Sequence, residues 1–240
     1  MFVGQLGTAA YQDIFVNGEV VKSGTQICDQ RYQLIRPILD RYQRKFSVLD
    51  LGALEGYFSW RIATDYNSVV TMIEGGEPGK GIYPYAKDGL FEMCGLNSHL
   101  KNVTYLSHWC TSESLAELGR REHFDVVLAL LSVHLIASCP KTGRVETDVF
   151  HEILDRVLAL GNEVIVEMAV DCYTSLDGLV AVECKKRGGT FMGGIARYKE
   201  DRKSWAHFYH FGSPSHLSGR DASPISESTF RDFGGVWPAG

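Results

Sequence analysis

Asp50, Gly52 and Gly56 follow a run of apolar residues and stand where an expected strand gives way to an expected helix. Gly52 permits a tight turn that brings backbone close to a ligand, and Gly56 lets the helix begin without an obstructing side chain. The spacing lacks the second glycine of the G-x-G-x-x-G dinucleotide fingerprint, because Ala53 and Leu54 follow Gly52. The loop therefore favours a bulky cofactor without phosphate groups over a pyrophosphate.

Glu74 ends the next expected strand. An acid at that position can accept hydrogen bonds from both ribose hydroxyls of a nucleoside. Enzymes that use nicotinamide dinucleotides have the same device, so Glu74 indicates a nucleoside without specifying which one. The alternative is a plain turn with incidental glycines and an exposed loop carboxylate, and the combination of glycine loop and acid favours the ligand.

Three more side chains that could take part in binding or catalysis lie at or near the ends of later expected strands. Trp109 follows the third strand, where its ring could stack on a base or simply anchor the core. His134 follows the fourth strand and is a candidate general base, since its ordinary pKa lies near neutrality; a histidine satisfied within a loop is the alternative. Glu167 lies within the apolar fifth strand and needs a partner or a ligand, so it orients a substrate or holds a loop.

The periodicity of apolar residues predicts the elements that position these side chains. Near-continuous apolar strands alternating with amphipathic helices predict a mostly parallel sheet that is covered on both faces. Pro37 predicts a kink or two abutting helices within 26–45, and Gly161 is expected just beyond the end of a helix. The expected strands are 46–52, 68–75, 102–108, 124–133, 162–170 and 204–212; the expected helices are 26–45, 56–66, 85–96, 112–121, 147–161 and 176–189; a hairpin is expected at 16–24.

We expect a single domain over residues 1–240, with an N-terminal helical cap (1–45), a core (46–211) and a Ser/Gly/Pro-rich tail (212–240) that forms a loop or a partly disordered end. The formal net charge of −5 lacks the basic excess typical of nucleic-acid-binding proteins. No apolar stretch has the length of a membrane span, and the N-terminus does not look like a signal peptide, so cytoplasm is the expected location.

The distribution of cysteine and histidine predicts no metal site. The six cysteines lie far apart without a CxxC pair, which argues against zinc and against a disulfide framework. His207 and His210 would point to opposite faces of the expected strand 204–212, so a shared metal is not expected. The aromatic residues of that strand are expected to form a wall of an acceptor pocket or part of the core.

Four segments resemble the class I methyltransferases that use S-adenosylmethionine, in their order and spacing. They are "VLDLGALEGYFS", Glu74, "FDVVLALLSVHLI" and "NEVIVEMAV", within residues 46–172. More narrowly, the run from Gly56 to Ser59 and the segment Ser132 to His134 are similar to the methyltransferase domain of the methyltransferase/kinases that terminate polymannose O-antigen chains. This sequence has one histidine where those relatives have two adjacent, and it shows no kinase region.

The resemblance implies a Rossmann-like α/β sandwich with a mostly parallel sheet, a C-terminal antiparallel hairpin and S-adenosylmethionine as cofactor. It implies cofactor contacts at Asp50, Gly52, Gly56 and Glu74, and a role for His134. Arg31, on the N-terminal helix, is expected to pair with the carboxylate of the cofactor. The full set expected around the cofactor is Asp50, Gly52, Ala53, Leu54, Gly56, Tyr57, Phe58, Glu74, Trp109, Leu131 and Arg31.

The sequence therefore predicts methyl transfer to an oxygen of a sugar, a sugar phosphate or another small metabolite, with His134 and Glu167 as candidate catalytic residues. A phosphate acceptor would need alignment only, whereas a hydroxyl would benefit from a base. The alternatives are an RNA-end or phosphate methyltransferase, a non-catalytic module that binds S-adenosylmethionine, and a nicotinamide-dependent oxidoreductase. The small-molecule or glycan acceptor is favoured over nucleic acid.

Overall fold

The structure is a computed structural model that describes residues 10–75, 93–137, 145–169, 177–200, 205–212, 222–233 and 235–236. The strands in these ranges are β1 (Ile14–Val16), β2 (Glu19–Lys22), β3 (Ser47–Leu51), β4 (Val69–Ile73), β5 (Val103–Leu106), β6 (Phe124–Leu130), β7 (Gly161–Ala169), β8 (Thr190–Ala196), β9 (Trp205–Gly212) and β10 (Gly235–Val236). The helices are α1 (Cys28–Leu39), α2 (Tyr57–Tyr66), α4 (Ser112–Arg121), α5 (Val133–Ile136), α6 (Thr147–Leu158), α7 (Asp177–Lys186) and α8 (Glu227–Asp232).

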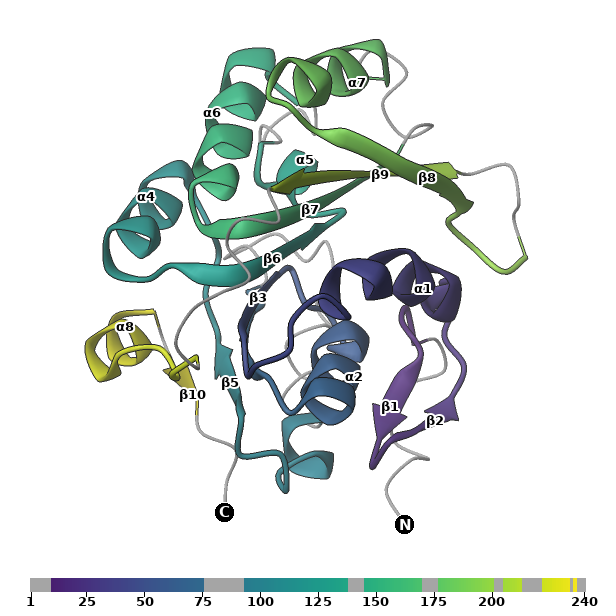
Figure 1. The fold of residues 1–240 in the computed structure, drawn as a ribbon, viewed down its shortest axis with the longest axis vertical. Coiled ribbons are helices and arrows are strands. Elements are labelled where there is room, and N and C mark those ends of the chain that lie inside the picture. The colour runs from purple at the N-terminus through teal and green to yellow at the C-terminus, as the bar shows by residue number, and fades with distance from the viewer. Residues whose placement is uncertain are drawn as a thin grey trace.

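The described strands other than β1 and β2 form one eight-stranded sheet in the order β10-β5-β4-β3-β6-β7-β9-β8. Strands β3 to β7 are parallel, whereas β9 runs antiparallel to β7, β8 to β9, and β10 to β5. The five parallel strands are Val/Ile/Leu-rich because both of their faces are buried. The α/β class and the C-terminal antiparallel hairpin predicted from the sequence are thus confirmed (Figure 1).

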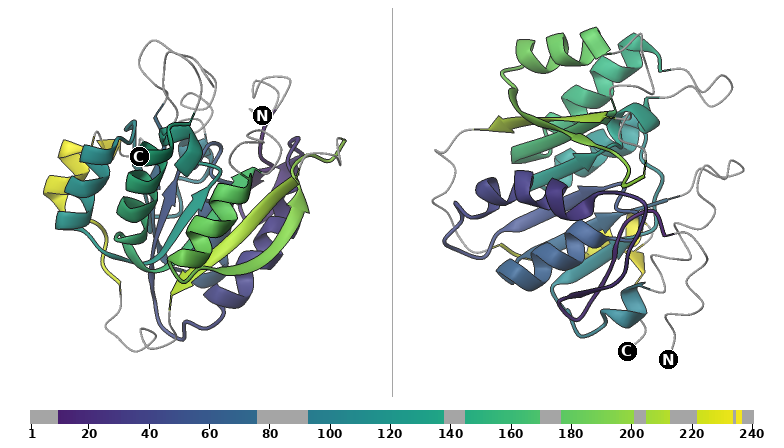
Figure 2. Two further views of the ribbon diagram at one scale, coloured as in Figure 1. Left: turned by 90° about the horizontal axis from the view of Figure 1, so that it is seen from above. Right: turned by 90° about the vertical axis from the view of Figure 1, so that its right-hand side faces the viewer.

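Helices cover both faces of the sheet (Figure 2). Helices α1 and α2 pack with one buried cluster, which includes Val48, Met72 and Ile165. Helices α4 and α6 pack with a second cluster on the other face, which includes Leu49 and Val127. Alternate residues along each strand therefore face α1 and α2 or face α4 and α6. Within the described ranges, no helix combines the length and apolarity that crossing a membrane requires.

The predicted hairpin at 16–24 is confirmed. Strands β1 and β2 pair antiparallel and are joined by Asn17 and Gly18, whose φ angles are 53° and 87°. Two positive φ values at the centre of a two-residue loop define the hairpin turn for which Asn-Gly is the preferred sequence.

Two expectations about the ends of helices need correction. Helix α1 is one helix that ends at Leu39, with Pro37 inside its last turn, so the two-helix alternative for 26–45 is wrong. Gly161 does not follow a helix end directly: helix α6 ends at Leu158 and Gly161 is the first residue of β7. A Cβ at Gly161 would lie 2.7 Å from Val127 Cγ2, so close packing between strands explains this glycine.

The hairpin was predicted without a residue range for its first strand, β8, and the tail contains more structure than its composition indicates. Residues 212–240 include α8 and β10, and β10 pairs with β5 at Tyr105 and Leu106. Ser226 caps α8 by accepting from the Thr229 amide, and Glu122 accepts hydrogen bonds from the Ser226 amide and hydroxyl. Of the helix expected at 85–96, residues 93–96 are helical and the rest lie outside the described residues.

Candidate functional site

The loop between β3 and α2 takes a conformation that depends on its glycines. Gly52 and Gly56 have φ angles of 74° and 78°, and Leu54 also adopts a positive φ of 53°. The amides of Gly52 and Ala53 both donate to the carbonyl of Ile73, at 2.9 and 3.2 Å, so the loop is tied to the end of β4. A Cβ at Gly56 would lie 2.6 Å from Trp60 Nε1. The sequence-based interpretation of these glycines as a tight turn and an unobstructed helix start fits this geometry.

Asp50 and Glu74 are buried beside this loop. The Ser59 hydroxyl donates to Asp50 Oδ2 at 2.7 Å, and the Leu54 amide donates to Glu74 Oε2 at 2.9 Å. Burial raises the pKa of Asp50 to about 7; the Ser59 hydrogen bond opposes this, and the nearby charge of Glu74 adds to it. Burial likewise raises the pKa of Glu74. Two desolvated carboxyl groups whose ionisation is disfavoured by burial would gain from a ligand with positive charge and hydroxyl donors.

The start of α2 is held by a segment far away in the sequence. Gly56 has no side chain to cap the helix, and Gln12 Oε1 instead accepts from the Tyr57 amide at 3.0 Å. The Glu55 carboxylate accepts from the amides of Tyr11 and Gln12 at 2.7 and 3.2 Å. Residues 11–12 thus clamp the glycine loop from outside. Sequence reasoning missed Gln12 and Glu55, because no local pattern marks a hydrogen bond between residues 45 apart.

Trp109 follows β5 and so lies at the same carboxyl end of the parallel strands as Glu74. The backbone of Gly75 lies against that of His108 and Trp109: a Cβ on Gly75 would come within 2.5 Å of the Trp109 amide nitrogen. Trp109 is partly buried. The structure therefore places the backbone of Trp109 next to the residue that follows Glu74, and stacking of its ring on a base stays a prediction.

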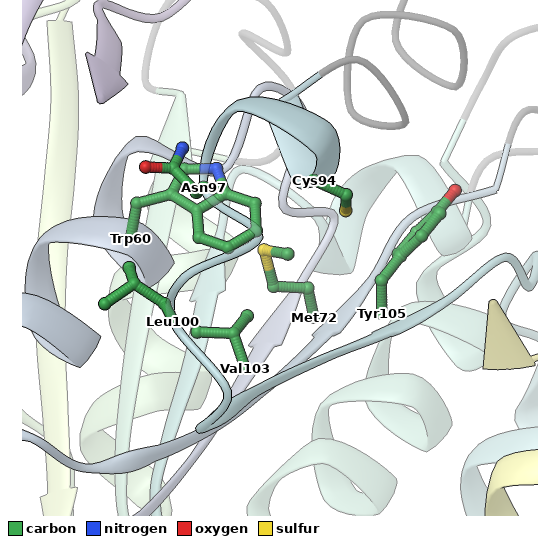
Figure 3. A pocket seen from close by; sticks show the side chains of 7 residues that line it. All are labelled: Trp60, Met72, Cys94, Asn97, Leu100, Val103 and Tyr105. Atoms are coloured by element: carbon green, nitrogen blue, oxygen red, sulfur yellow. The ribbon is translucent and has the colours of Figure 1, made fainter. Parts of the chain in front are cut away.

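A small pocket lies behind the glycine loop (Figure 3). Its lining residues are Trp60, Met72, Cys94, Asn97, Leu100, Val103 and Tyr105. Trp60 of α2 and Met72 of β4 also lie against the position of a Cβ on Gly56, so both pack against the end of the loop. Burial raises the pKa of the Cys94 thiol to about 12, which leaves it unreactive at neutral pH.

The end of β6 has an unusual backbone. Leu131 has a φ of 59° although it is not glycine, and its amide donates to the Glu167 carbonyl at 3.0 Å. Such conformations cost of order 1 kcal/mol or more and cluster at functional sites. Ser132 follows, with its Cβ 3.1 Å from where a Cβ on Gly52 would lie. The ends of β3, β6 and β7 therefore meet at Gly52, Ser132 and Glu167.

His134 lies in the short helix α5 and is 4% exposed. Burial, and to a lesser degree the charge of Arg197, lowers the pKa of His134 to about 3. The imidazole is therefore neutral in the working range of most enzymes, with a lone pair that can accept a proton or a hydrogen bond. It is also a weaker base than an exposed histidine.

Glu167 and Arg31 form a fully buried ion pair: Arg31 Nη2 lies 2.7 Å from Glu167 Oε1, and the two side chains are 1% and 0% exposed. Arg31 also donates to the side chain of Gln26. Burial raises the pKa of Glu167, and Arg31 and Arg197 reduce that shift. The structure thus joins two residues to which the sequence assigned separate roles. Contact between Arg31 and a cofactor carboxylate stays a prediction.

The other predicted site residues are distributed between the loop and the core. Ala53 and Leu54 lie in the glycine loop itself. The side chains of Tyr57 and Phe58 are buried, where the Tyr57 ring packs edge-on against Phe15 and Phe58. The backbone amide of Tyr57, at the start of α2, donates to Gln12 Oε1. Contacts of these residues with a cofactor stay predictions.

His207 and His210 have different neighbours on β9. The ring of His207 packs edge-on against Phe191, and His210 contacts the buried carboxylate of Glu163 near the start of β7. In the part of the chain that the structure describes, no group of three His, Cys, Asp or Glu side chains could hold a metal ion.

Known structures share this architecture, although no protein-family model and no curated protein sequence matches the chain. The N-terminal domain of EvdMO1 with S-adenosylhomocysteine bound superimposes with a TM-score of 0.54 and 11% identity, over 88% of this chain and 93% of that domain. The same domain in the presence of S-adenosylhomocysteine and D-fucose has a TM-score of 0.53 and 12% identity, again over 88% of this chain and 93% of that domain. A candidate O-methyltransferase from Klebsiella pneumoniae has a TM-score of 0.50 and 16% identity, over 76% of this chain and 78% of that protein.

The chain has the class I methyltransferase fold. The superfamily resemblance noted in the sequence is confirmed at the level of the fold, while the narrower resemblance to polymannose-terminating enzymes stays a prediction. In this fold the glycine loop after β3 and the acid after β4 lie next to each other, at the carboxyl ends of two adjacent parallel strands. Ligands of open α/β sheets bind at the carboxyl ends of the strands.

Proposed function

We propose that this protein transfers the methyl group of S-adenosylmethionine to an oxygen atom of a sugar, a sugar phosphate or a similar small metabolite. The observation that carries the proposal is the pair of buried carboxyl groups, Asp50 and Glu74, beside a glycine loop at the ends of β3 and β4. Both pKa values are raised, so the pair fits a ligand that brings cationic groups and ribose hydroxyls.

The residues present fit this cofactor. Gly52 and Gly56, both at positive φ, give the loop its tight turn beside the two acids. Asp50 would face the cationic amino-acid end of the cofactor, and Glu74 would accept from the ribose hydroxyls. Trp109 would flank the adenine. When bound, the cofactor supplies an electrophilic methyl group on a sulfonium, so the protein's task is to align an acceptor oxygen with it.

The acceptor class is supported by the neighbourhood of the loop and by one similar protein. Ser132 lies against Gly52 of the loop, Glu167 is linked through its carbonyl to Leu131, and His134 follows in α5, so three polar residues lie at or just after the ends of β6 and β7. EvdMO1, whose N-terminal domain shares the fold, has been crystallised in the presence of D-fucose. We therefore favour a carbohydrate acceptor.

Calorimetric titration tests the cofactor. We expect S-adenosylhomocysteine to bind with micromolar affinity, and NADH and NADPH not to bind, because the loop lacks a cradle for a pyrophosphate. Binding of a dinucleotide in preference to S-adenosylhomocysteine would contradict the proposal.

We further propose that His134 accepts the proton of a hydroxyl acceptor. With a pKa of about 3, the imidazole stays in its basic form, so the rate should show no inflection near pH 6.5 attributable to this residue. His134→Ala should lower the rate with a hydroxyl acceptor by roughly 10²–10⁴-fold without changing affinity for S-adenosylhomocysteine. A loss below fivefold would mean that the acceptor is already anionic or that His134 is structural. Rates are measured from labelled methyl transfer between pH 5 and 9.

A further inference from the structure

Two buried polar atoms at the ends of β6 and β7 lack hydrogen-bond partners among the described residues: Ser132 Oγ and Glu167 Oε2. The two residues are 4% and 0% exposed. Ser132 precedes α5 but its hydroxyl does not cap that helix. A buried polar group without a partner costs about 1–3 kcal/mol, more if it is charged. Such groups are rare in native proteins and call for a ligand or another specific reason.

The backbone places Ser132 and Glu167 at neighbouring positions where β6 and β7 end. Leu131, the residue before Ser132, donates its amide to the Glu167 carbonyl at 3.0 Å. Leu131 is held in a left-handed conformation with φ of 59°, which sets the direction of the chain at Ser132. Ser132 Cβ in turn lies against Gly52, at the glycine loop proposed to hold the cofactor.

The Glu167 carboxyl group is fixed at one oxygen. Its Oε1 lies 2.7 Å from Arg31 Nη2, which anchors the side chain and leaves Oε2 as the atom to be satisfied. An ionised carboxylate oxygen only accepts hydrogen bonds, whereas a serine hydroxyl both donates and accepts. Two neighbouring hydroxyl groups on one ligand match this pair, because one can donate to Glu167 and the other can exchange a hydrogen bond with Ser132.

We propose that Ser132 and Glu167 form an acceptor subsite that recognises two neighbouring hydroxyl groups of a carbohydrate or other polyol. This inference rests on the proposed methyltransferase function and narrows its acceptor to a vicinal diol. A free sugar and a sugar phosphate both carry such a diol. A compound with a single hydroxyl would leave one buried group unsatisfied and be rejected.

Saturation-transfer NMR on protein saturated with S-adenosylhomocysteine tests the subsite. The probes are D-fucose, D-mannose and D-mannose 6-phosphate, with cyclohexanol as the compound bearing one hydroxyl. The variants are Ser132→Ala and Glu167→Gln. The matched control is Glu163→Gln, which alters a second fully buried acid of β7. Glu163 Oε1 is paired with Arg41 Nη2 at 2.9 Å. Cofactor affinity of each sample is measured first by calorimetry.

We expect at least one diol to bind the wild-type protein and the Glu163→Gln variant, and both subsite variants to bind it at least tenfold more weakly with unchanged cofactor affinity. A preference for D-mannose 6-phosphate over D-mannose would identify a sugar phosphate as the source of the diol. Equal binding of cyclohexanol, no binding of any diol, or an equal loss in Glu163→Gln would overturn the subsite while leaving cofactor binding intact. Failure of the wild-type protein to bind S-adenosylhomocysteine would instead overturn the proposed function, and this inference with it.

Discussion

Asp50→Asn is expected to weaken binding of S-adenosylhomocysteine strongly and, at pH 8, to raise the melting temperature of the ligand-free protein. Asp50 is 2% exposed and its pKa is raised to about 7, so at pH 8 the folded protein carries a charge that its surroundings disfavour. Asparagine removes the charge and keeps an oxygen that can accept from Ser59. At about 1.4 kcal/mol per pKa unit, the stabilisation should be on the order of 2–4 kcal/mol. The same change removes the charge that would face the cofactor, and we expect a loss of affinity of roughly 100-fold.

The pH dependence of this effect has a definite sign. The pKa of Asp50 is higher in the folded than in the unfolded protein, so the folded state binds the proton more tightly. The stability contributed by protonated Asp50 is fully present below pH 4 and is lost as the pH rises towards 7. The stabilising effect of Asp50→Asn should therefore be largest above pH 7 and disappear near pH 4. Thermal denaturation between pH 4 and 8 measures it.

Asp125→Asn is the matched control for Asp50→Asn. Asp125 is also buried, on the adjacent strand β6, but Arg44 lies 2.6 Å from its carboxylate and the Ser47 amide donates to it. Removing this paired charge should lower the melting temperature, in contrast to Asp50→Asn. If both variants lose stability to the same extent, Asp50 has a structural role and our assignment of the cofactor site is wrong.

Glu167→Ala is expected to lower the free energy of unfolding by about 3–5 kcal/mol. It would leave the guanidinium of Arg31, which is 1% exposed, without its charged partner. The double variant Arg31→Met/Glu167→Leu should recover much of this loss, because replacing both members of a buried pair by apolar residues avoids the uncompensated charge. Urea denaturation of the two variants measures the difference.

Arg156→Ala is the exposed counterpart. Arg156 and Glu152 form an ion pair with side chains 47% and 50% exposed, so its loss should cost less than about 1 kcal/mol.

The double variant Arg31→Met/Glu167→Leu can also contradict the prediction. If it is no more stable than Glu167→Ala, the pair of Arg31 and Glu167 contributes through packing, because charge compensation would then explain none of the loss. That result would also weaken the view that Arg31 anchors Glu167 for an acceptor.

Much of the fold could be predicted because its signals are local. A buried parallel strand is a short apolar run, an amphipathic helix repeats every 3.6 residues, and Asn17-Gly18 specifies its own turn. The strands β8 and β10 could not be predicted in this way. Strand β8 contains the glycines 193 and 194, and β10 has only two residues, so both exist because a neighbouring strand offers hydrogen bonds.

The sequence by itself determined the order of the strands and helices in the parallel core, the glycine loop, and the placement of Asp50 and Glu74 at the ends of successive strands. These features depend on residue types within a few positions of one another. Only the tertiary structure decided that Arg31 pairs with Glu167, that Gln12 and Glu55 hold the start of α2, and that Ser132 lies against Gly52. Those contacts join residues distant in the chain, and their energies come from burial, which a local pattern does not contain.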